Sequence, residues 1–354
     1  MSFLTNISIK LKIVILFLIP ALALIYQTSS ISFDLYKTIQ EDTAVSKYVV
    51  IATNISALVH ESQKERGMTA GFLASQGKKF VFELPKQRTI TDQKLSILKK
   101  SLKTLSESEK IPVLMNDIHS AIEEADRLSS IRNRVSSLSI DKKEAIHYYT
   151  ALNGELLDTI GSVVKTSSNA KVTELASSYL SFLYAKERVG IERAIGAGVF
   201  ATKHISVDAK VKFTELIAEQ TAYLKVFKIL SSKTALDFYK EVSRKQVNAD
   251  VENMAKKILY ANGAEGLDVD ASVWFKTITK KIDLLKSVED KLTKELILSI
   301  EKTKEESSHA LFFSLAVNIV ILLIVLSLSI MISNNITGSM RPLHNPKDLS
   351  TLNF

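Results

Sequence analysis

The chain has 354 residues, with 46 Lys and Arg against 38 Asp and Glu, and it contains no Cys. The lack of Cys excludes disulfides and Cys-ligated metals. Its 11 Gly and 5 Pro are too few for the many tight turns of a β-sandwich, a barrel or a nucleotide-binding α/β sheet. Because 46% of the residues are apolar, disorder is also excluded. We therefore expect an all-α protein.

Two apolar runs are long enough to cross a membrane. Residues 310–332 carry no charge, and at 1.5 Å per residue they span a hydrocarbon core of ~30 Å. The first run, 13–25, follows Lys10 and Lys12 and continues weakly to Ile31, and it predicts a second transmembrane helix over 11–31. Within it, 21–23 (Ala-Leu-Ala) is an alternative signal-peptidase site, but the apolar run continues past it. That continuation favours an uncleaved anchor.

The charges at the ends of these runs predict the topology. Lys10 and Lys12 precede the first run, and Arg341 and Lys347 follow the second, so both ends are expected in the cytoplasm. The expected parts are a cytoplasmic N-terminus (1–10), a transmembrane helix (11–31), an outer helical domain (34–309), a second transmembrane helix (310–332) and a cytoplasmic tail (333–354). The outer domain is modestly basic, which suits a small anion better than a nucleic acid.

Helical spacing of apolar residues dominates the outer domain. Apolar side chains recur every three or four positions over 95–105 and 278–300, and most of them are expected in the core. We predict one helix from about Ala271 into the second span, and an extension of the first span toward Val59. Breaks are expected at 76–79, 83–85, 109–112, Asp141 and 262–266.

Glycines gather near a repeated triplet. Lys64-Glu65-Arg66 and Lys186-Glu187-Arg188 lie 122 residues apart, which predicts two similar helical halves. Inside a helix each glycine costs about 1 kcal/mol relative to alanine. Such a cluster implies either close approach of two helices or room for a ligand against the backbone, and both interpretations stay open. The glycines are Gly67, Gly71 and Gly77 in the first group and Gly190, Gly196 and Gly198 in the second.

The arginines in these segments differ in their local partners. No residue three or four positions from Arg66 or Arg193 is acidic, whereas Arg188 can pair with Glu192. Burial of an unpaired guanidinium costs several kcal/mol, so a partner must come from another helix or a ligand. The planar fork of donors suits a planar oxyanion. An acid such as Glu65 or Glu187 that pairs across the bundle is the open alternative.

At this point a family resemblance emerges. Segments 60–67, 70–73, 77–80 and 83–92 closely resemble the signature of the nitrate- and nitrite-sensing (NIT) family, and 186–201 is similar to that family's second motif. The resemblance implies two four-helix bundles over about 56–300 and an arginine-lined nitrate or nitrite site. The residues that carry over as ligand-binding candidates are Arg66, Arg188 and Arg193, with Arg88 as a fourth that would otherwise brace the loop.

The two ends resemble another family. Residues 6–14 resemble the first span of bacterial methyl-accepting chemotaxis receptors, and 335–343 resemble the opening of a HAMP linker. This implies a multi-pass signal-transduction protein of the bacterial inner membrane, with 34–309 in the periplasm or outside. The sequence stops at Phe354, before any output domain. A truncated or frameshifted gene, and an output on another chain, are both compatible with that ending.

Catalysis finds no support in the sequence. The six His have no metal-ligand spacing, His60 is expected on a helix surface, and no nucleophile elbow or P-loop occurs. We expect no enzyme, no cofactor and no metal. The expected partners are nitrate or nitrite, membrane lipid and a second copy of the chain in a parallel homodimer, with no nucleic acid.

The expected mechanism is sensory. An anion would bind between the helices that carry Arg66 and Arg188 or Arg193 and draw them together, and one span would move against the other. A non-sensing, membrane-tethered helical scaffold and an inactive receptor subunit are the alternatives.

Overall fold

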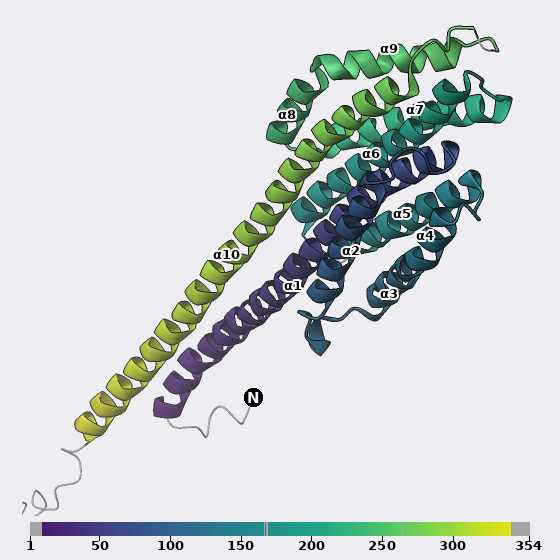
Figure 1. Cartoon of the computed structure of the whole chain (residues 1–354). Coiled ribbons are helices and arrows are strands. Elements are labelled where there is room, and N and C mark those ends of the chain that lie inside the picture. Colours follow the sequence, from purple (N-terminus) through teal and green to yellow (C-terminus); the bar gives the residue numbers. More distant parts are fainter. Residues whose placement is uncertain (1–8, 166, 168, 264, 341–354) are drawn as a thin grey trace, which may run out of the picture. The chain divides into compact units, whose positions relative to one another are not determined.

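The computed structural model describes residues 9–165, 167, 169–263 and 265–340. Apart from an isolated bridge between Asn262 and Glu265, all regular structure in these residues is helical, as predicted (Figure 1). The elements are α1 (Ile9–Ala74), α2 (Glu83–Leu102), the 3-10 turn η1 (Glu107–Glu109), α3 (Pro112–Asp126), α4 (Leu128–Ser136), α5 (Lys142–Val164), α6 (Ala170–Thr202), α7 (Val207–Leu230), α8 (Lys233–Ser243), α9 (Gln246–Tyr260) and α10 (Ala271–Met340).

The chain divides into two compact units. One consists of Asp42–Glu301, and the other of the described parts of Met1–Glu41 and Lys302–Phe354. Helices α1 and α10 contribute residues to both units.

In the unit Asp42–Glu301, α2 to α5 assemble with α1. The Tyr149 hydroxyl of α5 donates to Glu65 of α1 at 2.7 Å, and the Tyr148 hydroxyl donates to the Glu124 carbonyl of α3 at 2.6 Å. These bonds fix α5 between two neighbours, while a cluster around Leu98, Ile118 and other apolar residues fills the space among them.

The remaining helices of this unit assemble around α6. Ser232, at the start of α8, donates to Glu295 of α10 at 2.5 Å, and Lys210 of α7 donates to the Ala261 carbonyl after α9 at 3.0 Å. Figure 1 shows α7, α8 and α9 beside the N-terminal part of α10. The two assemblies meet where α6 packs against α1 and α5.

Helix boundaries follow the predicted local signals. Helix α1 ends at Ala74, and Gln76 and Gly77 then adopt positive φ angles of 50° and 78°. Asp141 caps α5 by accepting a bond from the Lys143 amide. Helix α10 begins at Ala271, as expected. Residues 83–85, predicted as a loop, instead form the first turn of α2, where a proline breaks no backbone bond.

The second unit pairs polar side chains of α1 and α10. Ser32 and Ser314, both buried, lie 2.8 Å apart between their hydroxyl oxygens, and Thr28 bonds Asn318. Large apolar side chains around them stay exposed, such as Leu16 (68%) and Phe313 (72%). Each helix contains an apolar window long enough to cross a membrane, with 11% of the α1 window and none of the α10 window buried.

Two sequence expectations fall partly outside the described residues. Residues 335–340 of the HAMP-like segment belong to α10, whereas 341–354 are not described, and neither are residues 1–8 of the expected cytoplasmic N-terminus.

Candidate functional site

Arg66 of α1 is completely buried and pairs with an acid across the helix contact. Its Nη1 donates to Glu187 of α6 at 2.6 Å and to the Thr150 hydroxyl of α5 at 3.0 Å. The alternative left open by the sequence, a carboxylate from another helix, is therefore realised for this arginine.

Arg193 of α6 is also buried, but its partners are neutral. Nη1 donates to the Thr279 hydroxyl at 3.0 Å, Nη2 donates to the Gln63 carbonyl at 2.7 Å, and the guanidinium lies 4.9 Å from the centre of the Phe275 ring. Among the described residues, no carboxylate lies within the 4 Å ion-pair distance of Arg193.

The pKa of Arg193 reflects the lack of a direct counter-charge among the described residues. Burial and the neighbouring positive charge of Arg66 lower the pKa of Arg193 to about 10, although Asp283 and Glu187 partly oppose the shift. Two guanidinium groups thus share the surroundings of one directly paired carboxylate, that of Glu187. Arg193 thus lies in a water-poor interior without a direct counter-charge among the described residues, and charges interact more strongly there than in water.

Several N–H donors of Arg66 and Arg193 are unsatisfied. Within the described part of the chain, Nε and Nη2 of Arg66 and Nε of Arg193 are buried without a hydrogen-bond partner. Such groups cost about 1–3 kcal/mol each, and more when charged. Unused, forked N–H donors on two neighbouring guanidinium groups match the needs of a small planar anion that accepts several bonds.

The glycines lie directly against these arginines. A Cβ on Gly190 would stand 2.8 Å from Nη2 of Arg66, and a Cβ on Gly67 would stand 3.3 Å from Nη2 of Arg193 and 2.9 Å from the Phe275 ring. Gly196 likewise makes room for the Trp274 ring, whose indole donates to the Arg193 carbonyl at 3.0 Å. Close helix packing therefore accounts for these glycines.

Arg188, another predicted ligand residue, occupies a different environment. Its Nε donates to Glu219 of α7 at 2.7 Å, and its guanidinium lies 4.8 Å from the Tyr223 ring centre. The expected Arg188–Glu192 pair is wrong, because Glu192 is buried and instead accepts a bond from Gln220.

Arg88 belongs to a third cluster. It donates to Ser136 at 2.9 Å and lies 4.0 Å from Glu65, whose two carboxylate oxygens are held by Arg132 at 2.7 and 2.8 Å. This bracing role is the alternative that the sequence left open for Arg88. Of the four candidates, the structure brings together only Arg66 and Arg193.

Sequence reasoning missed the neutral partners and misplaced His60. Gln63, Thr279 and Phe275 complete the site, but the last two come from α10, far along the chain, and no local spacing indicates them. His60 is buried rather than on a surface, and burial together with Lys186 lowers its pKa.

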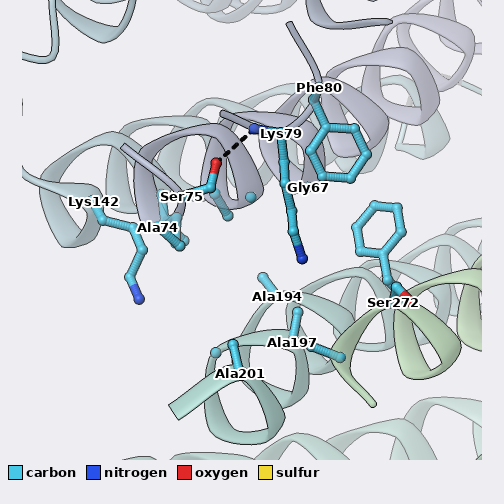
Figure 2. A pocket seen from close by; sticks show the side chains of 16 residues that line it. Gly67, Ala74, Ser75, Lys79, Phe80, Lys142, Ala194, Ala197, Ala201 and Ser272 are labelled. Atoms are coloured by element: carbon cyan, nitrogen blue, oxygen red, sulfur yellow. Dashed lines mark hydrogen bonds between the residues drawn. The ribbon is translucent and has the colours of Figure 1, made fainter. Parts of the chain in front are cut away.

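A cavity of about 430 Å³ adjoins the arginine pair. Gly67, Ala194 and Phe275 belong to its lining, so it reaches residues next to Arg193 without including the guanidinium groups. Figure 2 shows Lys79 and Lys142 extending toward this space from its sides. The cavity is thus apolar in its walls, with ammonium groups at its edge.

Comparison with known proteins shows which family these motifs belong to. The family model described as nitrate and nitrite sensing (NIT) matches residues 57–297, more than half of the chain. The chain belongs to the NIT family. The family description names nitrate and nitrite, which are small anions of the kind that the unused donors of Arg66 and Arg193 suit.

Two relatives support the assignment. Over 247 residues the chain is 24% identical to the nitrate regulatory protein of Klebsiella oxytoca, covering 70% of this chain and 62% of that protein's length. The structure of the NasR transcription antiterminator matches with a TM-score of 0.70 at 20% identity, over 78% of this chain and 79% of that one. The latter likeness establishes the NIT-like all-α fold. Neither description names a chemoreceptor, so the NIT family is the level at which the resemblance holds.

Proposed function

We propose that this chain is a membrane-bound sensory receptor that binds nitrate or nitrite at Arg66 and Arg193. The observation that carries the proposal is Arg193, a buried guanidinium with only neutral hydrogen-bond partners among the described residues. Membership of a family described as nitrate and nitrite sensing supplies the ligand class.

The bound anion would use the idle donors. Nε and Nη2 of Arg66 and Nε of Arg193 each supply a charge-assisted bond worth about 1.5–3 kcal/mol. Nitrate has four heavy atoms, and a ceiling of about 1.5 kcal/mol per atom limits binding to roughly 6 kcal/mol, or tens of micromolar. Glu187 competes for Arg66 and keeps the affinity below that ceiling.

The packing around Arg66 and Arg193 indicates how an anion would enter the site and which helices would then move. Lys79 and Lys142 at the edge of the adjoining cavity would attract an anion toward Gly67 and Phe275. Helices α1 and α6 already touch through Gly67 and Gly190, so an incoming anion would separate them. This direction is opposite to the approach expected from sequence. The two helical assemblies, as the two four-helix halves of the resemblance, would be the bodies that shift.

The membrane part of the proposal rests on α1 and α10. Both carry exposed apolar windows of spanning length, and positive residues flank the windows on their outer chain ends. The proposal includes a bacterial inner membrane with 34–309 outside the cytoplasm, lipid around the spans and a second copy as partner. The chemoreceptor-like and HAMP-like ends belong to the same proposal.

Calorimetry on the full chain in detergent tests the binding site. Nitrate and nitrite are expected to bind in the micromolar range, and Arg193→Gln is expected to abolish the heat. Arg188→Gln is the matched control, because Arg188 already pairs with Glu219 and its loss should leave affinity unchanged. Equal, weak heat with chloride would contradict an oxyanion site.

Cysteine labelling on intact cells tests the topology, since the chain has no Cys of its own. A membrane-impermeant maleimide is expected to label Lys143→Cys in the outer domain but not Asn334→Cys beyond the second span. Both positions are exposed. Labelling of neither in intact cells and of both after lysis would place the helical domain in the cytoplasm.

The Arg66–Glu187 pair favours a second candidate function, a tethered scaffold that binds no anion. In a scaffold both arginines would serve packing alone. Arg193 argues against it, because a purely structural guanidinium would gain from a carboxylate that the described residues do not supply. The nitrate calorimetry separates the two functions.

A further inference from the structure

A second cavity of about 240 Å³ lies among α6, α7, α8, α9 and α10, away from the arginine pair. Its volume is below the ~300–1,000 Å³ of pockets for drug-sized ligands, so it suits a smaller molecule. Apolar side chains such as Phe182, Val251 and Leu285 form much of its wall. Charged side chains from three of its helices join them.

Glu192 is the most buried acid of this cavity. Only 2% of it is exposed, and it accepts one hydrogen bond, from Gln220 at 2.8 Å. No cation lies within 4 Å of its carboxylate among the described residues. Burial raises the pKa of Glu192, against the attraction of Lys281 and the Gln220 bond. The carboxylate therefore has acceptor capacity that the protein leaves unused.

Lys281 of α10 lines the same cavity and is its counterpart in charge. Its ammonium makes no hydrogen bond and no ion pair with any described residue. The other charges in the cavity wall are already matched. Lys186 pairs with Glu289 of α10, and Glu252 of α9 pairs with Lys256 at 2.8 Å.

We propose that this cavity binds a small zwitterion of the amino-acid class, with its ammonium on Glu192 and its carboxylate on Lys281. The two protein charges attract each other but stand farther apart than an ion pair, so a molecule that carries both charges can join them. The apolar wall would hold an aliphatic side chain. This site is independent of the proposed nitrate site.

Calorimetry on the full chain in detergent tests the proposal with L-leucine and L-valine as probes. Two analogues of leucine, 3-methylbutylamine and 4-methylpentanoate, each keep the aliphatic part and one charge. The amino acids are expected to bind, and each single-charge analogue is expected to bind about tenfold or more weakly, because one charge-assisted bond is lost. Amine binding as tight as leucine binding would overturn the zwitterion assignment, and so would failure of both amino acids to bind.

Variants then locate the site. Glu192→Gln and Lys281→Met are each expected to weaken amino-acid binding by about tenfold or more. Glu215→Gln of α7 is the matched control outside the cavity wall, because its partner is Lys212, and it should leave binding unchanged. A melting curve on each variant verifies folding. Unchanged binding in both Glu192→Gln and Lys281→Met would overturn the proposal.

Arg193→Gln distinguishes this inference from the nitrate proposal. It is expected to keep amino-acid binding while nitrate binding is lost. Loss of amino-acid binding in folded Arg193→Gln would assign the heat to the arginine pair and overturn the second site.

Discussion

Nη2 of Arg66 lies against Gly190, so close that a Cβ there would stand only 2.8 Å away. The relation is reciprocal, because Arg193, three residues beyond Gly190, lies against Gly67, the residue that follows Arg66. Helices α1 and α6 thus each supply one guanidinium, and each guanidinium packs against a glycine of the other helix. Buried charge and missing side chains are parts of one arrangement, in which the glycines make space for the arginines.

Gly190→Ala is expected to disturb this arrangement. Overpacking costs about 1–3 kcal/mol and outweighs the ~1 kcal/mol gained in helix propensity, so the variant should be less stable and bind nitrate more weakly. Gly154→Ala in α5 is the control, because a Cβ there meets nothing within 4 Å, and it should stabilise by up to ~1 kcal/mol. Denaturant unfolding measures both. Equal stability of the two variants would show that Arg66 moves aside freely.

Glu187→Gln separates the internal carboxylate from the external anion. Without Glu187, two buried guanidiniums lose their one direct ion pair, and the anion-free chain is expected to lose about 3–5 kcal/mol of stability. Nitrate should then replace the missing charge, so that the rise in melting temperature on addition of nitrate exceeds that of the unmodified chain. A variant that melts like the original and shows the same nitrate response would mean that Glu187 does not compete for the site.

The sequence predicts features that depend on neighbouring residues of one helix, but few of the contacts between distant helices. Caps and turns at Asp141 and Gly77 were readable because their signals are local. The lack of an acid three or four positions from Arg66 was also correct, yet Glu187 reaches it from α6. Such a contact depends on how α1 crosses α6, and a single sequence does not contain that crossing.

Glu192 shows the same limit. At i+4 from Arg188 it was expected to be able to pair with that arginine, but α7 contacts the two residues separately, through Glu219 and Gln220. The orientation of α6 that buries Glu192 also directs the side chain of Arg193 toward α1. Adjacent residues therefore serve different sites, and only their packing partners reveal which.

Two buried glutamates should respond to pH in opposite directions. Burial raises the pKa of Glu192, so the folded chain holds its proton more tightly than the unfolded chain, and stability falls as pH rises through the window above the ordinary glutamate pKa. For Glu289, burial opposes the shift, but Lys186 and Lys286 outweigh it and lower the pKa. Its contribution is present at neutral pH and is lost as pH falls below the ordinary value.

Glu192→Gln and Glu289→Gln test these signs in unfolding experiments across pH. At pH 7 Glu192→Gln should be more stable than the original chain, with the gain vanishing in acid, where both side chains are neutral. Glu289→Gln should lose about 3–5 kcal/mol, because it leaves the buried Lys186 unpaired. Destabilisation by Glu192→Gln at neutral pH would mean that its carboxylate has a cationic partner in the folded chain.

The paired serines of α1 and α10 allow a direct test of how the two apolar segments associate. Because the Ser32 and Ser314 hydroxyl oxygens lie 2.8 Å apart, Ser32→Cys with Ser314→Cys places two sulfurs within bonding reach in a chain that has no other Cys. Mild oxidation in membranes should remove both free thiols while the chain stays monomeric on a denaturing gel. Ser32→Cys with Phe313→Cys is the control and should keep its thiols, because Phe313 is exposed. A disulfide-linked dimer as the main product would show that the serine contact forms between two copies rather than within one.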